Sequence, residues 1–150
     1  MQDNKAVLSV NDLKKSFTLK QGLLSVIKKE KVKKIKAIDG INFSIHPGET
    51  FGIAGESGCG KSTTAKTIVR LHAPTDGEII FNNENIAYLK GNELKKFRRQ
   101  AQMIFQDPYE SLNPRYTIRR ILSEPLNNFN IGQTKHDKDK KIIETLNIVN

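Results

Sequence analysis

The sequence predicts an α/β fold with an N-terminal antiparallel β segment, and three observations predict it. The N-terminal third holds short, partly alternating segments bounded by polar or turn residues, as is typical of strands, at residues 6–10, 15–20 and 40–45. After a turn, an apolar strand pattern covers residues 50–54. A glycine-rich loop follows directly, and a helical pattern begins in it at Lys61 and continues to Leu71.

Strand and helix patterns alternate after this first helix. Residues 74–77, which include a proline, an aspartate and a glycine, predict that the helix ends and that a strand follows at residues 78–82. Residues 92–99 show a helical pattern, and residues 102–105 indicate another buried strand. A loop that contains two prolines covers residues 107–115.

Two further helices are expected after that loop. The first spans residues 117–128, with Pro125 near its end. The second begins at a capping box, in which Thr134 caps the helix and Asp137 stands three residues on. Its apolar residues recur at helical spacing and predict one apolar face, formed by Ile142, Ile143, Leu146 and Val149.

Length and composition are those of one ordinary globular domain. The chain has 150 residues, of which 37% are hydrophobic and 27% charged. No apolar run approaches the roughly 20 residues of a membrane-spanning helix, and the first residues lack the apolar core of a signal peptide. We therefore expect any contact with a membrane to go through a partner or the protein surface. The single cysteine, Cys59, favours a reducing, cytoplasmic setting because it cannot form an internal disulfide.

The formal net charge of +9 suits an anionic partner, and this charge is unevenly distributed. Residues 28–36 alone contain six lysines and one glutamate. We interpret this run as a solvated loop. A second interpretation joins it to the preceding apolar residues as a short basic amphipathic element at an anionic lipid surface, with an apolar side made of Leu23, Leu24, Val26 and Ile27.

Residues 55–62 match the pattern G-x-x-x-x-G-K-[ST] at every fixed position, which is the pattern of a phosphate-binding loop. Glycines let the backbone curl so that successive N–H groups converge on phosphate oxygens. The helix that begins at Lys61 directs its positive end to the same place. The strand before and the helix after the loop argue against a chance match. The residues expected to contact a nucleotide are Gly55, Glu56, Ser57, Gly58, Cys59, Gly60, Lys61, Ser62, Thr63 and Thr64.

Individual side chains of this loop have distinct expected roles. Lys61 reaches the β- and γ-phosphates as a point charge, and the Ser62 hydroxyl is an oxygen ligand suited to Mg²⁺. Thr63 or Thr64 would hydrogen-bond the α-phosphate. We interpret Cys59 as a tolerated small residue; the other interpretation is a reactive thiolate, favoured by the helix start and the neighbouring lysine.

Three stretches of the sequence together resemble the ATP-binding subunits of ABC transporters. They are the loop with its flanks (IAGESGCGKSTT, residues 53–64), TDGEI (75–79) and MIFQDPYESLNP (103–114). The last stretch, with residues 118–126 after it, is similar to the ATPase subunits of oligopeptide and dipeptide importers. The resemblance covers nearly the whole chain. It implies a P-loop NTPase core of the ABC ATPase type, with the beginning of a helical subdomain at residues 116–150.

The resemblance also implies ATP and Mg²⁺ as cofactors, and roles for two residues outside the loop. Gln106 would touch Mg²⁺ and the attacking water, a task that suits an amide because it offers a donor and an acceptor without charge. Phe17 would stack on adenine. The implied partners are transmembrane permease subunits, a second homologous ATP-binding subunit and, indirectly, an extracytoplasmic substrate-binding protein. The implied place is the inner face of the cell membrane, with no nucleic acid involved.

Three elements of this family's pattern have no match in the sequence. There is no glycine-rich signature motif, no apolar strand that ends in Asp-Glu, and no switch histidine; we interpret His46, His72 and His136 as surface or turn residues. Residues 1–150 are therefore interpreted as the N-terminal part of a nucleotide-binding domain, which makes it an incomplete domain. We expect it to bind ATP weakly without hydrolysing it, because no carboxylate is available to position or activate the water.

Several functions remain open on the sequence alone. The resemblance implies that the complete protein uses ATP binding and hydrolysis to energise import of oligopeptides or dipeptides, but nickel and glutathione importers share the motif style. A P-loop kinase or GTPase would explain residues 55–62 but leaves residues 105–114 without a role. A basic nucleic-acid-binding module would use residues 28–36, which lack interleaved aromatic residues.

Overall fold

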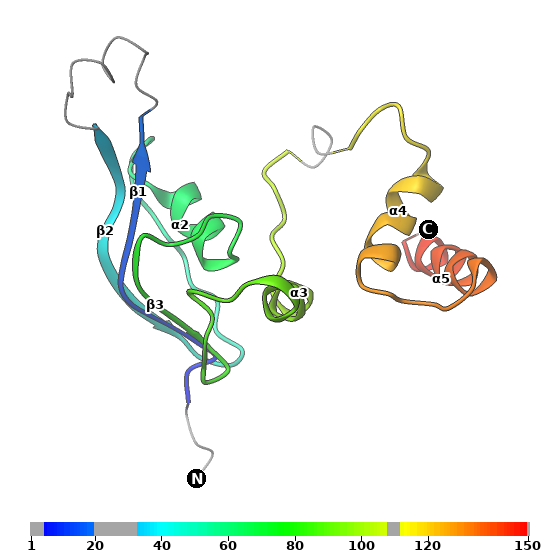
Figure 1. Ribbon diagram of the computed structural model, residues 1–150, viewed down its shortest axis with the longest axis horizontal. Helices are drawn as coiled ribbons and strands as arrows, with labels where there is room; N and C mark the ends of the chain where they lie inside the picture. The colour runs from blue at the N-terminus through cyan, green and yellow to red at the C-terminus, as the bar shows by residue number, and fades with distance from the viewer. Residues whose placement is uncertain (1–4, 20–32, 108–111, 150) are drawn as a thin grey trace. The chain divides into compact units, whose positions relative to one another are not determined.

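The computed structural model describes residues 5–19, 33–107 and 112–149. It divides into two compact units, Met1–Met103 and Ile104–Asn150. The first unit contains the described strands and the glycine-rich loop, and the second contains two helices (Figure 1).

An antiparallel sheet forms the frame of the first unit, as expected for the N-terminal segment (Figure 1). The strand order is β2-β1-β3-β4, and the strands cover Lys34–Ile45 (β2), Leu8–Thr18 (β1), Asp76–Phe81 (β3) and Glu84–Asn85 (β4). The register of β1 shifts between Val10 and Leu13, where Asp12 has a left-handed φ of 45°. Such a bulge bends a strand without ending it. The segments predicted as separate strands at residues 6–10 and 15–20 therefore contribute to one strand, Leu8–Thr18.

Two helices pack against the core of this sheet. α2 covers Lys61–Ile68 and α3 covers Gly91–Gln100. The predicted helices are thus confirmed, although α2 ends at Ile68 rather than at Leu71. The strands, α3 and the connection before α3 contribute the buried core, which consists of Leu8, Val10, Leu13, Ile38, Ile79, Ile86, Ala87 and Phe97.

A buried arginine ends α2 and fixes the turn after it. Arg70 is 6% exposed and has a left-handed φ of 59°, which a helix cannot continue. Its guanidinium donates to the carbonyl oxygens of Ile86 at 2.9 Å, Leu89 at 3.1 Å and His72 at 3.5 Å. Its own carbonyl oxygen accepts a hydrogen bond from Arg98 of α3 at 2.6 Å. Burial, and after it the charge of Arg98, lowers the pKa of Arg70.

The second unit contains two helices that contact each other. α4 covers Ile118–Asn128 and α5 covers Lys135–Ile148, so both predicted helices are confirmed. Arg119 on α4 and Asp139 on α5 form a salt bridge with two hydrogen bonds. The hydrogen bond from Arg119 lowers the pKa of Asp139.

The start of α5 has the predicted capping box. The Thr134 hydroxyl accepts a hydrogen bond from the Asp137 N–H at 3.1 Å, and the Asp137 carboxylate accepts one from the Thr134 N–H at 2.8 Å. These bonds, the backbone one first, lower the pKa of Asp137. The predicted apolar face is only partly buried: Ile142 is 6% exposed, but the other three residues are 37% to 76% exposed, namely Ile143, Leu146 and Val149.

Two predicted strands are wrong. Residues 50–54 and 102–105 are not strands, and no described strand pairs with either segment. A strand is held by hydrogen bonds to a neighbouring strand, so an apolar pattern without such a neighbour does not become one. The expected burial also fails, because Phe51 and Ile53 are each 41% exposed and Ile104 is 92% exposed.

The basic run at residues 28–36 is partly a strand rather than a loop. Residues 34–36 begin β2, where Lys34 pairs with Thr18 and Lys36 with Ser16. All three are exposed, so the expected solvation holds for them. Residues 28–32 and the amphipathic element expected at residues 23–27 lie outside the described residues. Within the described ranges, no helix combines the length and the apolar character needed to span a membrane.

Candidate functional site

The glycine-rich loop leads directly into the first turn of α2. The N-cap residue is Gly60, with φ 102°, and no side chain caps the helix. The Thr64 N–H donates to the Gly60 carbonyl at 2.8 Å, and the N–H groups before it have no acceptor within the helix. The first turn of α2 also contains no acidic residue. This helix start therefore presents N–H donors and a positive dipole end, an arrangement that attracts anions.

Two glycines are required by close contacts of the loop. A Cβ atom at Gly60 would lie 2.4 Å from the carbonyl oxygen of Ala37 on β2, and one at Gly55 would lie 2.7 Å from the Cys59 Sγ. Atoms cannot approach so closely. A larger residue at Gly60 would displace the loop from the backbone of β2, whereas one at Gly55 would require the Cys59 side chain to move. A Cβ atom at Gly58, in contrast, meets nothing within 4 Å. The loop is thus packed against β2 at Gly60 and open at Gly58.

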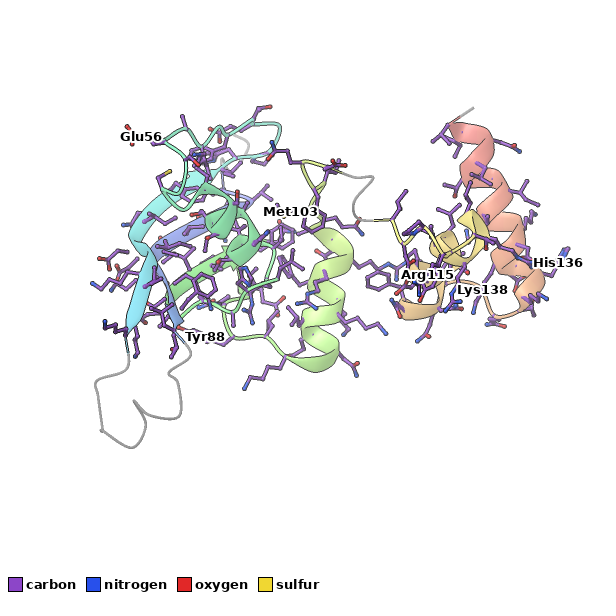
Figure 2. All side chains as sticks on the ribbon, turned by 90° about the horizontal axis from the view of Figure 1, so that it is seen from above. Glu56, Tyr88, Met103, Arg115, His136 and Lys138 are labelled. Atoms are coloured by element: carbon purple, nitrogen blue, oxygen red, sulfur yellow. The ribbon has the colours of Figure 1, made fainter. Side chains whose placement is uncertain are left out.

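The Lys61 side chain turns back into the loop. Its Nζ donates to the carbonyl oxygens of Gly55 at 2.7 Å and Glu56 at 2.6 Å, and lies 3.6 Å from the Cys59 Sγ. Carbonyl dipoles hold the ammonium without neutralising it, so its charge stays available to an anion. None of the salt bridges among the described residues involves Lys61. Glu56, the acidic residue of the loop, lies at the outer edge of the unit (Figure 2).

The hydroxyl residues at the start of α2 differ in their access to solvent. Ser62 is exposed, Thr63 is half-buried, and Thr64 is only 6% exposed. Ser62 therefore has the most accessible hydroxyl of the three. Ser57 and Cys59 are exposed within the loop itself.

An open cavity of ≈ 350 Å³ borders the loop. Cys59, Lys61 and Thr64 line it together with residues 51–54 and part of β2. Two of its walls are the rings of Phe43 and Phe51, which stack with centroids 4.7 Å apart. The cavity therefore combines an aromatic wall with the Lys61 side chain at the edge of the loop.

Phe17 lies at the part of the sheet that the loop contacts. It pairs with Ile35 of β2, and Ala37, against which Gly60 packs, stands two residues further along β2. The loop and the Phe17 ring therefore belong to the same end of the β1–β2 pair. Phe17 is 36% exposed, so part of its ring is open to a ligand.

Gln106 belongs to the second unit and is exposed, and its role beside a metal stays a prediction. Among the described residues, no group of three or more His, Cys, Asp or Glu side chains is placed to hold a metal ion.

Three residues that support this site have almost no signal in the sequence. Ala37 provides the carbonyl against which Gly60 packs, although the two are far apart in the chain. Lys15 and His72 both contact the Phe17 ring, and the sequence indicates only that His72 lies at the surface or in a turn. The contacts with Ala37 and His72 join residues that are far apart in the chain, and no motif specifies them. The one available signal is the spacing from Lys15 to Phe17, which places both on the same side of a strand.

Known proteins similar to this chain are transport ATP-binding proteins. Residues 38–150 match the family described as ABC transporter. The chain is 44% identical over 145 residues to the oligopeptide transport ATP-binding protein AppF of Bacillus subtilis (strain 168), which covers 96% of this chain and 43% of that protein. It is 42% identical over 144 residues to the oligopeptide transport ATP-binding protein OppF of the same organism, covering 95% and 44%. The chain thus spans less than half the length of these relatives.

Solved structures with a similar fold are ATP-binding cassettes. The cassette MJ0796, solved as a dimer in a post-hydrolysis state bound to ADP and Pi, is 28% identical with a TM-score of 0.66, covering 93% of this chain and 56% of that one. The protein cbiO1 from Clostridium perfringens, part of the ABC transporter complex cbiONQ, is 25% identical with a TM-score of 0.61, covering 95% and 49%. These similarities support the predicted fold, an incomplete α/β P-loop NTPase domain.

Proposed function

The chain belongs to the ABC transporter family, and from that premise we propose that residues 55–62 bind the phosphates of ATP. The observation that carries the proposal is the position of the Lys61 ammonium, which the carbonyl oxygens of Gly55 and Glu56 hold inside the loop at 2.7 and 2.6 Å. This fixed charge and the uncapped start of α2 together complement an anion with several negative charges. The match to this family argues against a P-loop kinase or GTPase.

The residues of the loop divide the contacts to a bound nucleotide among them. Residues 55–60 supply backbone N–H groups, and Lys61 supplies the charge for the β- and γ-phosphates. Ser62 and Gln106 are the proposed ligands of Mg²⁺. Ser62 is exposed, and its hydroxyl is an oxygen ligand suited to this ion. When bound, Mg²⁺ neutralises charge on the phosphate oxygens. Thr63 or Thr64 would hydrogen-bond the α-phosphate.

Phe17 is the proposed contact for the base of the nucleotide. Its ring is part-exposed, and it stands near the point where Gly60 packs on β2. An aromatic face stacks on any base, and it adds binding energy without reading the base edges.

We expect these 150 residues to bind ATP without hydrolysing it. The sequence holds no apolar strand that ends in Asp-Glu, so it offers no carboxylate to orient the attacking water. Residues 1–150 are accordingly proposed as the N-terminal part of a nucleotide-binding domain, with residues 116–150 as the beginning of its helical subdomain.

In its complete form the protein is proposed to energise the import of oligopeptides or dipeptides. The names of the relatives AppF and OppF support this substrate class over nickel or glutathione. The proposed partners are transmembrane permease subunits and a second cassette, in line with the dimer of MJ0796, and indirectly an extracytoplasmic substrate-binding protein. The proposed location is the cytoplasmic face of the membrane.

The dependence of affinity on phosphate number tests the proposed nucleotide site. Equilibrium binding of Mg·ATP, Mg·ADP and AMP would be measured on the full chain. Because Lys61 is assigned to the β- and γ-phosphates, AMP should bind at least about tenfold more weakly than ATP. Equal affinities for AMP and ATP would refute a site that recognises the phosphate chain.

Uptake of a labelled oligopeptide tests the proposed transport role. The full-length protein would be expressed with its permease partners, with either Lys61 or Lys66 replaced by alanine. We expect loss of uptake only with Lys61→Ala, since Lys66 lies in the last turn of α2, at the opposite end from the loop. Unchanged peptide uptake in Lys61→Ala would rule out this ATPase as the source of energy.

A further inference from the structure

We propose that Lys15 and His72 are positioning residues, which fix the Phe17 ring for stacking on the base of a bound nucleotide. This inference rests on the function proposed above for Phe17 and extends it to two residues that no motif includes. Both act through the ring and have no assigned contact with the nucleotide. The contacts around Phe17 carry the proposal.

Lys15 holds one face of the ring. Its Nζ lies over the Phe17 ring, 4.9 Å from the ring centroid, which is within the range of an attractive cation–π contact. The same Nζ donates to the carbonyl oxygen of Ala73 at 2.7 Å. The ammonium is therefore anchored from two sides, and a base would stack on the opposite face of the ring.

The His72 ring contacts the Phe17 ring nearly at right angles to it. The two rings have centroids 5.4 Å apart and an interplanar angle of 86°, which is a favourable T-shaped contact. The His72 N–H donates to the carbonyl oxygen of Lys66 at 3.1 Å, in the last turn of α2. His72 thus connects the Phe17 ring to the helix whose first turn carries Lys61.

The segment that carries His72 is itself fastened to β1 next to Phe17. The Thr75 N–H donates to the Lys14 carbonyl at 2.8 Å, and the Thr75 hydroxyl accepts a hydrogen bond from the Ser16 N–H at 2.9 Å. Together with the bond from Lys15 to Ala73, these contacts hold residues 73–75 along the strand. Continuous contacts therefore lead from the phosphate loop through α2 and His72 to Phe17.

The exposure of Phe17 favours a role in binding over one in the core. The ring is 36% exposed and is not part of the buried cluster of the sheet. A ring that is fixed before a ligand arrives loses less side-chain freedom on binding, and the affinity rises accordingly. Lys15 and His72 would supply this preorganisation.

Binding of ATP and of inorganic tripolyphosphate to the full chain separates base from phosphate contacts. Lys15→Met and His72→Ala should each weaken ATP binding about three- to tenfold, which is part of what base stacking contributes. Both variants should leave tripolyphosphate binding unchanged. In a Phe17→Leu background neither substitution should weaken ATP binding further. With Phe17 present, the conservative variants Lys15→Arg and His72→Phe should keep ATP affinity close to that of the wild type. Lys96→Met, on the exposed side of α3, is the control for loss of one charge.

Three results would overturn the inference, and each has a different meaning. Equal weakening of ATP and tripolyphosphate by Lys15→Met would show that Lys15 acts on the phosphates as a charge. Undiminished effects in the Phe17→Leu background would show that the ring is not involved. If Phe17→Leu itself binds ATP as tightly as the wild type, the Phe17 ring does not stack on the base, although the proposal of phosphate binding at residues 55–62 is unaffected. Failure of the proposed function itself would be distinct, because ATP and tripolyphosphate would then bind the wild type no more tightly than they bind Lys61→Ala.

Discussion

The residues of the phosphate loop are held by a few local contacts rather than by burial. Residues 51–59 are all exposed. The loop keeps its form because Gly60 packs on Ala37 and because Lys61 binds two of the loop's own carbonyl oxygens. Single substitutions at these positions should therefore alter the loop while the core of the sheet stays intact.

Replacing Gly60 with alanine should destabilise the chain more than replacing Gly58. Both glycines have left-handed backbones, with φ 102° and 81°, but only a Cβ at Gly60 would meet another atom, at 2.4 Å from the Ala37 oxygen. We expect the left-handed backbone to cost each variant about 1–2 kcal/mol in the free energy of unfolding, and the clash with Ala37 to cost Gly60→Ala about 1–3 kcal/mol more than the matched control Gly58→Ala. Urea denaturation measures both. Equal losses would show that contact with β2 does not constrain the loop.

Arg70 is a buried residue whose replacement should be costly. Arg70→Met would leave three carbonyl oxygens without their guanidinium donor, so we expect the free energy of unfolding to fall by about 2–4 kcal/mol. Arg99→Met, at an exposed position on α3, is the matched control and should change it by less than about 0.5 kcal/mol. A small effect of Arg70→Met in thermal or urea unfolding would contradict the role assigned to this arginine.

Among the elements, helix α5 begins at a residue that the neighbouring sequence alone predicts. Its capping box forms as predicted, with both reciprocal bonds between Thr134 and Asp137. Its apolar face is less well determined, because burial of that face depends on what packs against it. Of the four described residues predicted to form this face, only Ile142 is buried.

The capping box should make the stability of α5 depend on acid pH. In the folded chain the pKa of Asp137 lies below its ordinary value of 3.8. A carboxylate with a lowered folded pKa stabilises the helix above its unfolded pKa, and this contribution disappears as the pH falls through the folded value. Helix content followed by circular dichroism from pH 6 to pH 2 should therefore decrease below about pH 4.

Removal of the cap separates this effect from general acid unfolding. Thr134→Ala should raise the pKa of Asp137 towards its ordinary value, as measured by NMR titration of the carboxyl carbon. Thr145→Ala, which removes a hydroxyl that donates to the Lys141 carbonyl in the same helix, should leave that pKa unchanged. An Asp137 pKa that does not respond to Thr134→Ala would count against the capping box as its cause.

Elements with local signals could be predicted from the sequence, and elements that depend on distant partners could not. The start of α2 at Lys61 and the capping box of α5 are specified by neighbouring residues, and both are confirmed. Residues 50–54 and 102–105 have strand patterns, but a strand needs a hydrogen-bonded neighbour, and none of the described strands provides one. The bulge at Asp12 likewise joins what the pattern divides into two strands.

For the molecule as a whole, the motif predicts the chemistry of the site but not the residues that support it. The pattern at residues 55–62 predicted a loop between a strand pattern and a helix, and the family match agrees with it. The contacts of Gly60 with Ala37 and of Phe17 with Lys15 and His72 arise only when the sheet is assembled. The contacts with Ala37 and His72 join residues far apart in the chain, which no local pattern specifies, whereas Lys15 and Phe17 are two residues apart on β1 and only their strand pattern could indicate the contact.

The net charge of +9 adds a further consideration, since it attracts anions to the whole surface. Binding of ATP is therefore informative only when it depends on the loop and survives physiological salt, which screens exposed charges beyond about 8 Å. A lysine elsewhere on the same helix provides the matched control for charge.

Isothermal titration of Mg·ATP at physiological salt, with the wild type, Lys61→Ala and Lys66→Ala, examines the phosphate loop itself. Both substitutions remove one positive charge from α2, but only the Lys61 ammonium lies within the loop. We expect at least about tenfold weaker binding for Lys61→Ala, the scale of one charge-assisted hydrogen bond, and wild-type affinity for Lys66→Ala. Equal affinity in all three proteins would contradict nucleotide binding at residues 55–62.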